Sequence, residues 1–369
     1  MKIAFNGVKI KAKKYKKDIL KKVSEVIDRG VFLNGPENQE LIKSLEKYLL
    51  AGHLITTSSG HNALLIALRR LPIGPDDEVI FPVNVYPTAF AVAQSGAIPV
   101  PVDVDHNGLI DINEIKKKIT KRTKTIVVVH LYGLVVDLDE IKKIIKGKDI
   151  ILIEDCAQAF GSLYKNKPVG TFGDISCFSF YPTKNLATLG NGGAIWCRDE
   201  KLYEYFKKAV AYGAATIYKS EFVAGHSRLS EIQASVLNIY FKDFKNECRT
   251  RGKIAKQYEK SFERYPSLAR VNLLLNSAKD SSPALHLFVV ECEKRDKLKA
   301  YLSKKNIETH IHYPEPVHLL KAFAHLKYKE RSFPKAEYLS RRILSLPFHS
   351  YLTQEEIDYI AKSIKEFYD

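Results

Sequence analysis

Residues 149–161 read DIILIEDCAQAFG, an uninterrupted apolar run that ends in two acids, an amide and a glycine. A short run of this kind predicts a strand buried on both faces, as in a parallel sheet. Neighbouring side chains on a strand point to opposite faces, so at most one of Glu154 and Asp155 can face a ligand. A buried carboxylate needs a cation or a donor, and the alternative is that Asp155 only caps a following helix.

The same pattern extends through the first 200 residues, where apolar runs alternate with helical periodicity. The other runs are HLITTSSG (53–60), DEVIFPV (77–83), IPVPVDV (98–104) and TIVVVHLYG (125–133). This alternation predicts an α/β fold with a mostly parallel central sheet flanked by helices. Ligands collect at the carboxyl ends of such strands, which makes four segments candidates for a site. They are SSGH (58–61), NVYP (84–87), HLYG (130–133) and EDCAQ (154–158).

The pattern changes in the second half of the chain. From about residue 228 it becomes helical, and after about residue 283 short strands return between amphipathic helices. We therefore expect three parts: an N-terminal helical segment (1–30) packing on the small domain, a large α/β domain (31–245) and a small C-terminal α+β domain (246–369).

The composition limits the partners of the protein. The 58 Lys and Arg residues exceed the 42 Asp and Glu residues, which gives a net charge of +16. The lysines alternate with apolar residues and Glu at helical spacing, as in residues 13–27, and no nucleic-acid-binding motif accompanies them. We expect solvated helix faces, no nucleic-acid partner and a preference for anionic, phosphorylated substrates.

The cysteine pattern and the hydropathy bear on metal sites and compartment. The five cysteines are widely spaced, and no CxxC pair occurs, so we expect neither disulfides nor a metal site. No run is long and apolar enough for a membrane span, and the N-terminus lacks the apolar core of a signal peptide. The sequence predicts a cytoplasmic protein without a membrane partner.

A lysine in an unusual setting is the strongest chemical signal. Residues 177–195 read CFSFYPTKNLATLGNGGAI and place Lys184 in an apolar turn bounded by glycines. Loss of hydration there disfavours the ammonium form and leaves an amine that can attack carbonyl groups. A lysine alone is more often structural, with its tip in solvent, but a nearby Asp155 could pair with a protonated pyridine nitrogen.

Two further segments would suit a planar, phosphorylated ligand. TTSSGHNALLIAL (56–68) predicts a strand, a glycine turn at Gly60 and a helix N-terminus, where exposed amides bind anions. Taken alone this is a weak signal, since serine caps many helices. Tyr86 follows a strand and could lie flat against a ring or belong to the core.

Together these segments resemble the DegT/DnrJ/EryC1 family of pyridoxal-phosphate-dependent sugar aminotransferases, which have the type I fold. The resemblance runs from about Ile19 to Ala361. It rests on GDISCFSFYPTKN and GNGGAI, VVVHLYG, IEDCAQAFGSLYKNKPVGTFGD, SRLSEIQA, HYPEPVHLL and LSLPFH, in the order of the family.

The resemblance implies the roles of the cofactor residues. Lys184 occupies the position that forms the internal aldimine with pyridoxal 5′-phosphate and later moves a proton as a base. Asp155 matches the partner of the pyridinium nitrogen, and Gln158 matches the partner of the phenolic oxygen. Pyridoxamine 5′-phosphate would be the intermediate form of the cofactor in a ping-pong reaction.

The resemblance also implies a phosphate site, at which two residues depart from the family. Ser179, Gly60 and His61 match phosphate-binding positions, and Tyr86 matches the residue that stacks on the ring. His61 stands where Thr is usual. His226 stands where the family has an Asn that the partner subunit contributes. We hypothesise that both histidines face the phosphate across a dimer interface; the alternative is that either one packs or caps.

The reaction implied is amino transfer from L-glutamate to a keto group of a dTDP-, UDP- or GDP-linked deoxysugar. The amino sugar would serve surface polysaccharides such as lipopolysaccharide, or natural products. Arg228, His312 and Tyr313 match substrate-facing positions, and a C2 homodimer is implied.

Other reactions and roles stay open. A dehydratase or a cyclic-ketone aminotransferase of the same family is one alternative, but such dehydratases carry histidine where this chain has Lys184. A non-catalytic regulatory or nucleic-acid-binding protein is another, and it predicts loss of the catalytic set, which is intact.

Overall fold

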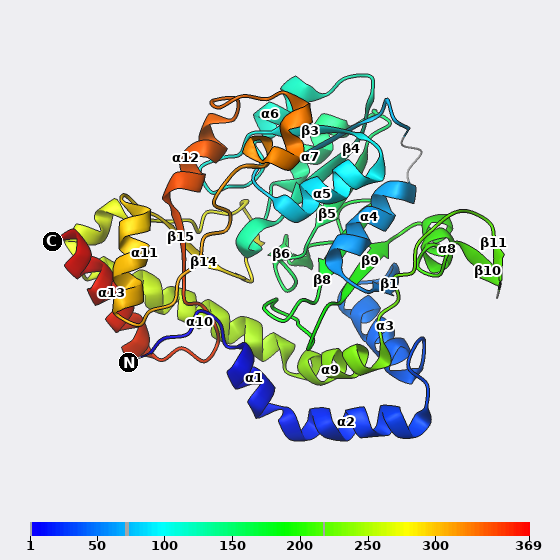
Figure 1. The fold of residues 1–369 in the computed structure, drawn as a ribbon, viewed down its shortest axis with the longest axis horizontal. Helices are drawn as coiled ribbons and strands as arrows, with labels where there is room; N and C mark the ends of the chain where they lie inside the picture. Colours follow the sequence, from blue (N-terminus) through cyan, green and yellow to red (C-terminus); the bar gives the residue numbers. More distant parts are fainter. Residues whose placement is uncertain (1, 71–73, 217) are drawn as a thin grey trace.

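The computed structural model describes residues 2–70, 74–216 and 218–369 (Figure 1). Its centre is a seven-stranded sheet with the order β1-β9-β8-β5-β4-β2-β3. The strands are β1 (His53–Thr57), β2 (Glu78–Pro82), β3 (Ile98–Val102), β4 (Thr123–Val129), β5 (Ile151–Asp155), β8 (Ile175–Ser179) and β9 (Gly193–Cys197). Strand β9 runs antiparallel to β1 and β8, and the other pairings are parallel. The predicted α/β fold with a mostly parallel sheet is confirmed.

Helices cover both faces of this sheet, since most side chains of its central strands are apolar. Every residue of β2 is buried, and so are nearly all residues of β4 and β5. The helices of this part are α3 (Pro36–Tyr48), α4 (Gly60–Arg70), α5 (Tyr86–Ser95), α6 (Ile112–Lys118), α7 (Leu138–Ile145), α8 (Glu200–Ala209) and α9 (Glu231–Lys242). Burial on both faces leaves the strand ends as the places where polar side chains can gather.

The C-terminal part is built on a small antiparallel sheet, as Figure 1 shows beside the long helix α10 (Phe244–Glu263). Its strands are β12 (Asn272–Leu273), β14 (Phe288–Glu291) and β15 (Ile343–Leu346), and its other helices are α11 (Arg295–Lys304), α12 (Pro334–Arg342) and α13 (Gln354–Tyr368). The N-terminal helices α1 (Val8–Lys14) and α2 (Lys16–Arg29) follow a segment in which Ile3 pairs with Ile307 of this part. Helix ends fall near residues 30 and 245, while the division into separate domains stays a prediction.

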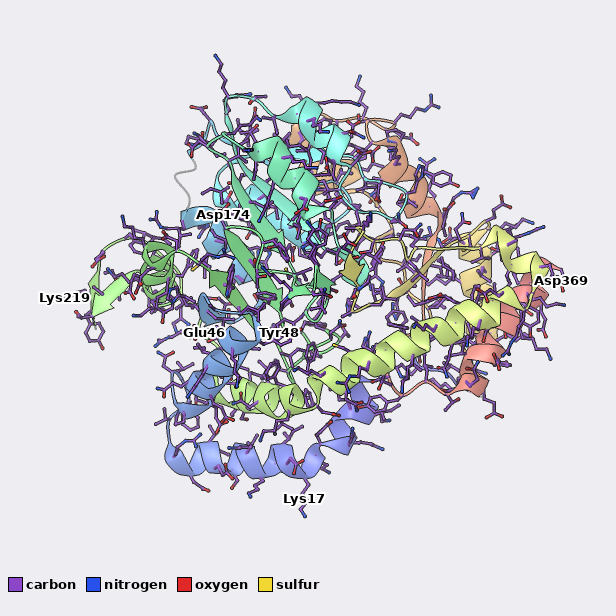
Figure 2. The ribbon with its side chains drawn as sticks, turned by 180° about the vertical axis from the view of Figure 1, so that it is seen from behind. Lys17, Glu46, Tyr48, Asp174, Lys219 and Asp369 are labelled. Carbon is purple, nitrogen blue, oxygen red and sulfur yellow. The ribbon has the colours of Figure 1, made fainter. Side chains whose placement is uncertain are left out.

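Short elements complete the fold. They are β6 (Leu163–Tyr164), β7 (Lys167–Pro168), β10 (Ala214–Thr216), β11 (Lys219–Ser220) and β13 (Ser281–Ser282), with 3-10 turns at Leu131–Gly133, Pro266–Arg270, Val317–Leu319 and Lys321–Leu326. Strands β10 and β11 form an arm that projects from the body, with Lys219 at its far end in Figure 2. Among the described helices, none has the length and hydropathy that a membrane crossing would need.

Candidate active site

The candidate segments meet at one edge of the large sheet, where the carboxyl ends of its parallel strands lie. A cavity of about 340 Å³ occupies this edge. Most of the residues predicted from the sequence line it, namely Gly60, His61, Asp155, Gln158, Ser179, Lys184, His312 and Tyr313. Tyr86, His226 and Arg228 are placed outside its lining.

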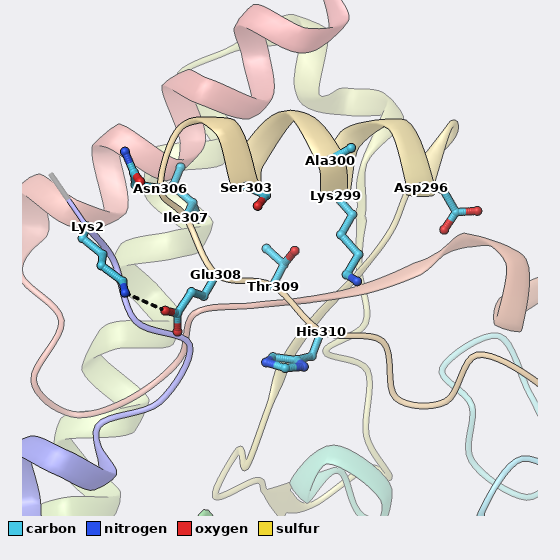
Figure 3. A pocket seen from close by; sticks show the side chains of 10 residues that line it. All are labelled: Lys2, Asp296, Lys299, Ala300, Ser303, Asn306, Ile307, Glu308, Thr309 and His310. Atoms are coloured by element: carbon cyan, nitrogen blue, oxygen red, sulfur yellow. Dashed lines mark ion pairs between the residues drawn. The ribbon is translucent and has the colours of Figure 1, made fainter.

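A larger cavity, of about 630 Å³, lies elsewhere, beneath α11 (Figure 3). Its walls are polar, and its Lys2 ammonium pairs with Glu308 at 3.6 Å. The volume of a cavity alone therefore does not identify the functional site. The convergence of perturbed titratable groups favours the smaller cavity.

Lys184 lies in the turn after β8, where its backbone N–H donates to the carbonyl of Tyr181 at 2.8 Å. Desolvation in the cavity wall lowers the pKa of the Lys184 amine to about 8, and attraction to the Asp155 carboxylate opposes this shift. The uncharged amine is therefore more populated near neutral pH than in a solvated lysine, whose pKa is about 10.4. The sequence anticipated this setting from the apolar, glycine-bounded turn.

Asp155 ends β5 and is buried with both carboxylate oxygens occupied. Its Oδ2 accepts a hydrogen bond from the Thr88 hydroxyl at 2.7 Å, and its Oδ1 accepts one from the Ala157 amide at 3.0 Å. Burial raises the pKa of Asp155, whereas the bond from Thr88 lowers it. The residues after Asp155 form turns, so this carboxylate does not cap a helix.

Glu154, on the opposite face of β5, belongs to the structure rather than to the cavity. Its oxygens accept from the amides of Gly170, Phe172 and Gly173, and His130 Nε2 lies 3.1 Å from its Oε2. Burial alone would raise the pKa of Glu154, but His130 and the amides hold it below the usual value. The alternation of side chains along the strand thus separates a ligand-facing acid from a structural one.

Two hydrogen bonds hold the side-chain amide of Gln158 in one orientation at the cavity. Its Oε1 accepts from the backbone N–H of Tyr132 at 2.8 Å, and its Nε2 donates to the Tyr313 hydroxyl at 3.3 Å. The amide is therefore oriented with its donor toward the cavity. Tyr313 in turn stacks on Tyr86, with ring centroids 5.0 Å apart.

His312 comes from the C-terminal part and closes another wall of the cavity. Its Nδ1 lies 2.9 Å from the Ser345 hydroxyl, and its backbone carbonyl accepts from the Tyr132 hydroxyl. Burial, with His310 and Lys184 nearby, lowers the pKa of His312 to about 4, so its ring is neutral at physiological pH.

The end of β8 and the start of α4 form a close-packed corner around Gly60, Ser179 and Gly193, here called the glycine corner. A Cβ atom on Gly60 would lie 2.6 Å from the Ser179 Cβ, and one on Gly193 would lie 2.6 Å from the Gly60 nitrogen. Only glycine permits this approach, which sets the amides of the first turn of α4 beside the Ser179 hydroxyl. His61 Nε2 lies 3.0 Å from Oε1 of Gln94, an atom that only accepts, so the ring donates to it.

His226 and Arg228 lie together near the base of the arm. Arg228 Nε donates to His226 Nε2 at 2.9 Å, and His226 is exposed. Partial burial and the Arg228 charge lower the pKa of His226. The predicted contact of His226 with a cofactor of a partner subunit stays a prediction.

Sequence reasoning missed three residues of this region. Thr88 bonds to Asp155, Tyr132 orients Gln158, and His286 lines the cavity. Each lies in or beside an apolar run, where a polar side chain gives no local sign of its partner. Tyr132 belongs to the candidate segment HLYG, but the sequence gives no sign of its left-handed backbone, at φ 62°.

Comparison with known proteins relates nearly the whole chain to one family. The profile of the DegT/DnrJ/EryC1/StrS aminotransferase family matches residues 13–365. A Streptomyces venezuelae relative, dTDP-3-amino-3,4,6-trideoxy-alpha-D-glucose transaminase, is 36% identical over 94% of this chain and 90% of its own.

Solved structures agree with this result. S. venezuelae DesV, solved with a ketimine intermediate, superposes with a TM-score of 0.95 at 34% identity, covering 100% of this chain and 99% of DesV. NtdA from Bacillus subtilis, solved with bound cofactor PMP, gives a TM-score of 0.88 at 28% identity, covering 96% of this chain and 82% of NtdA. The predicted fold type, aminotransferase class and pyridoxal phosphate cofactor are confirmed, and the chain belongs to the DegT/DnrJ/EryC1/StrS aminotransferase family.

Proposed function

We propose that the protein transfers the amino group of L-glutamate to a keto group of a nucleotide-linked deoxysugar, with Lys184 as its catalytic residue. The observation that carries the proposal is the cavity itself. It brings together an amine of lowered pKa, a buried carboxylate and an oriented amide donor, beside a glycine corner suited to an anion. The similarity to sugar transaminases supports a nucleotide sugar as the acceptor.

The residues present fit pyridoxal phosphate. The Asp155 carboxylate suits a protonated ring nitrogen, the Nε2 donor of Gln158 suits a phenolic oxygen, and the first turn of α4 with Ser179 suits a phosphate. When bound, this cofactor supplies an aldehyde that takes up the amino group and a ring that delocalises electrons.

The side chains then have separate tasks. Lys184, with its amine of lowered pKa, would hold the aldehyde carbon of the cofactor and would serve as the base that accepts and returns a proton during amino transfer. Thr88 and the Ala157 amide donate to the Asp155 carboxylate and stabilise its charged form, which burial disfavours. Gln158 is held by the Tyr132 amide, so its orientation is fixed before any ligand enters.

The acceptor sugar would enter past Tyr313 and His312, whose neutral ring can exchange hydrogen bonds without adding charge. Arg228 would bind the diphosphate or a carboxylate, because a guanidinium offers paired donors to such groups. His61 and His226 would face the phosphate, in place of the Thr and Asn usual in the family.

A homodimer completes this proposal. Exposed apolar side chains gather on the arm and on the segment between α2 and α3, which is unusual for a free surface. They are Val31, Phe32, Leu33, Tyr212, Tyr218 and Val223. Tyr218 and Val223 are fully exposed in the single chain. A C2 partner covering these side chains would also bring His226, at the base of the arm, toward the second cavity.

The proposed reaction is tested by incubating the holoenzyme with L-glutamate and a panel of dTDP-, UDP- and GDP-linked keto sugars. Mass spectrometry should detect an aminated nucleotide sugar together with 2-oxoglutarate. A product that has lost a hydroxyl without gaining nitrogen would instead identify a dehydratase. Sedimentation velocity should give a dimer, and Val223→Asp should weaken it.

A further inference from the structure

His286 is the one cavity-lining histidine that the proposed mechanism leaves without a task. It lies just before β14 and is fixed through its backbone on both sides. Its N–H donates to the Tyr132 carbonyl at 2.7 Å, and its carbonyl accepts from Arg251 Nη2 at 2.7 Å. These bonds fix the backbone of His286 against the HLYG turn and α10, beside the cavity that its side chain lines.

The ring nitrogens of His286 differ in their surroundings. The residue is 6% exposed, and its Nδ1 is sealed from solvent without a hydrogen-bond partner in the described chain. A buried N–H group without an acceptor costs more free energy, and is rarer, than a buried lone pair without a donor. The proton therefore belongs on Nε2, which is the nitrogen left to meet a ligand in the cavity that the ring lines.

The charges around this ring favour an anion. Burial, with Lys184 and then Arg251 nearby, holds the pKa of His286 well below its usual value, so the ring is neutral. The buried Arg251 guanidinium donates to the His286 carbonyl, and the Oε1 atom of Glu247 lies 3.9 Å from Arg251 Nη1. A neutral N–H donor with Lys184 and Arg251 nearby suits an anionic ligand better than a cationic one.

We propose that His286 is a further substrate-binding residue, whose Nε2–H donates a hydrogen bond to the α-carboxylate of the amino donor. The inference rests on the proposed function, since it takes L-glutamate as the donor. The glycine corner at Gly60 and Ser179 already supplies donors for a phosphate. The α-carboxylate, by contrast, is attached to the carbon that must react beside Lys184.

The test uses 2-oxoglutarate, which carries the same carboxylates but no amine, so it binds the aldehyde form of the enzyme without reacting. Its Kd is measured by calorimetry for the wild type, His286→Phe and His286→Gln, each loaded with pyridoxal phosphate. His286→Phe should weaken binding about 10-fold or more, while His286→Gln, which keeps an N–H donor, should stay within about threefold. UDP and dTDP binding should be unchanged in both variants.

Several outcomes would overturn the inference. Equal Kd values for wild type and His286→Phe would show that no such bond exists, and a parallel loss of nucleotide binding would show general damage to the site. The cofactor absorbance band, retained in both variants, is the control for folding. A wild type that neither responds to L-glutamate nor binds 2-oxoglutarate would instead fault the donor in the proposed function and the inference with it.

Discussion

The Thr88 hydroxyl donates a 2.7 Å hydrogen bond to Oδ2 of Asp155, and both side chains are buried. Thr88 stands in the first turn of α5, whereas Asp155 ends β5, 67 residues later in the chain. The bond stabilises the charged carboxylate in a place where burial raises its pKa. The bond therefore favours the ionised form of Asp155, which is the form proposed to pair with the cofactor ring.

Replacing Thr88 with Val should raise the pKa of Asp155 further, because the stabilising bond is lost and the burial remains. Pyridoxal phosphate affinity should fall by about 1–3 kcal/mol, with the largest loss at acidic pH, where more of the carboxyl is protonated. Spectrophotometric titration of the cofactor between acidic and neutral pH measures this. Thr88→Ser keeps the hydroxyl and should behave like the wild type; equal affinity in all three proteins at every pH would refute the role.

The Lys184 amine should set the pH dependence of cofactor capture. With a pKa of about 8, the uncharged amine becomes more abundant as pH rises through this value, so the capture rate should rise and then level off. Asp155 raises the pKa of Lys184, so Asp155→Asn should move the midpoint to lower pH. Stopped-flow absorbance of the cofactor-free protein gives both profiles, and a midpoint near 10 would contradict the desolvated setting.

Gly60→Ala should damage the corner between α4 and β8. The added Cβ would meet the Ser179 side chain and backbone at 2.6 and 3.0 Å. We expect a loss of about 1–3 kcal/mol in unfolding free energy, measured by urea denaturation, together with weaker phosphate binding. Gly252→Ala is the matched control: the site is open, lies within α10 and should gain about 0.5–1 kcal/mol.

The two histidine departures can be tested by restoring the family residues. His61→Thr and His226→Asn should leave cofactor affinity unchanged or improve it, if both histidines face the phosphate. Equilibrium dialysis of pyridoxal phosphate measures this. Weaker binding in both variants would contradict that placement.

Much of the fold was predictable because its signals are local. The central strands are mostly apolar and polar segments follow them directly, so both the α/β class and the edge that holds the site could be inferred. The antiparallel direction of β9 could not be inferred, since an apolar run looks the same in either direction.

The site was only partly predictable for a related reason. Lys184 and Asp155 stand out because a charged residue in an apolar setting needs a partner. Thr88 and His286 do not, because their partners are distant in sequence and their neighbours are apolar. Tyr86 was expected to stack on the ring of the cofactor, and its present partner is Tyr313, a contact from a distant segment.

The most direct test of the proposed function is the near-ultraviolet and visible absorbance of the protein loaded with pyridoxal phosphate, before and after L-glutamate. The wild type should show a cofactor band that L-glutamate bleaches, and Lys184→Ala should lack the covalently bound form of the band. A wild type that binds the cofactor but gives no response to L-glutamate, or a Lys184→Ala variant that gives the same spectrum, would contradict the account.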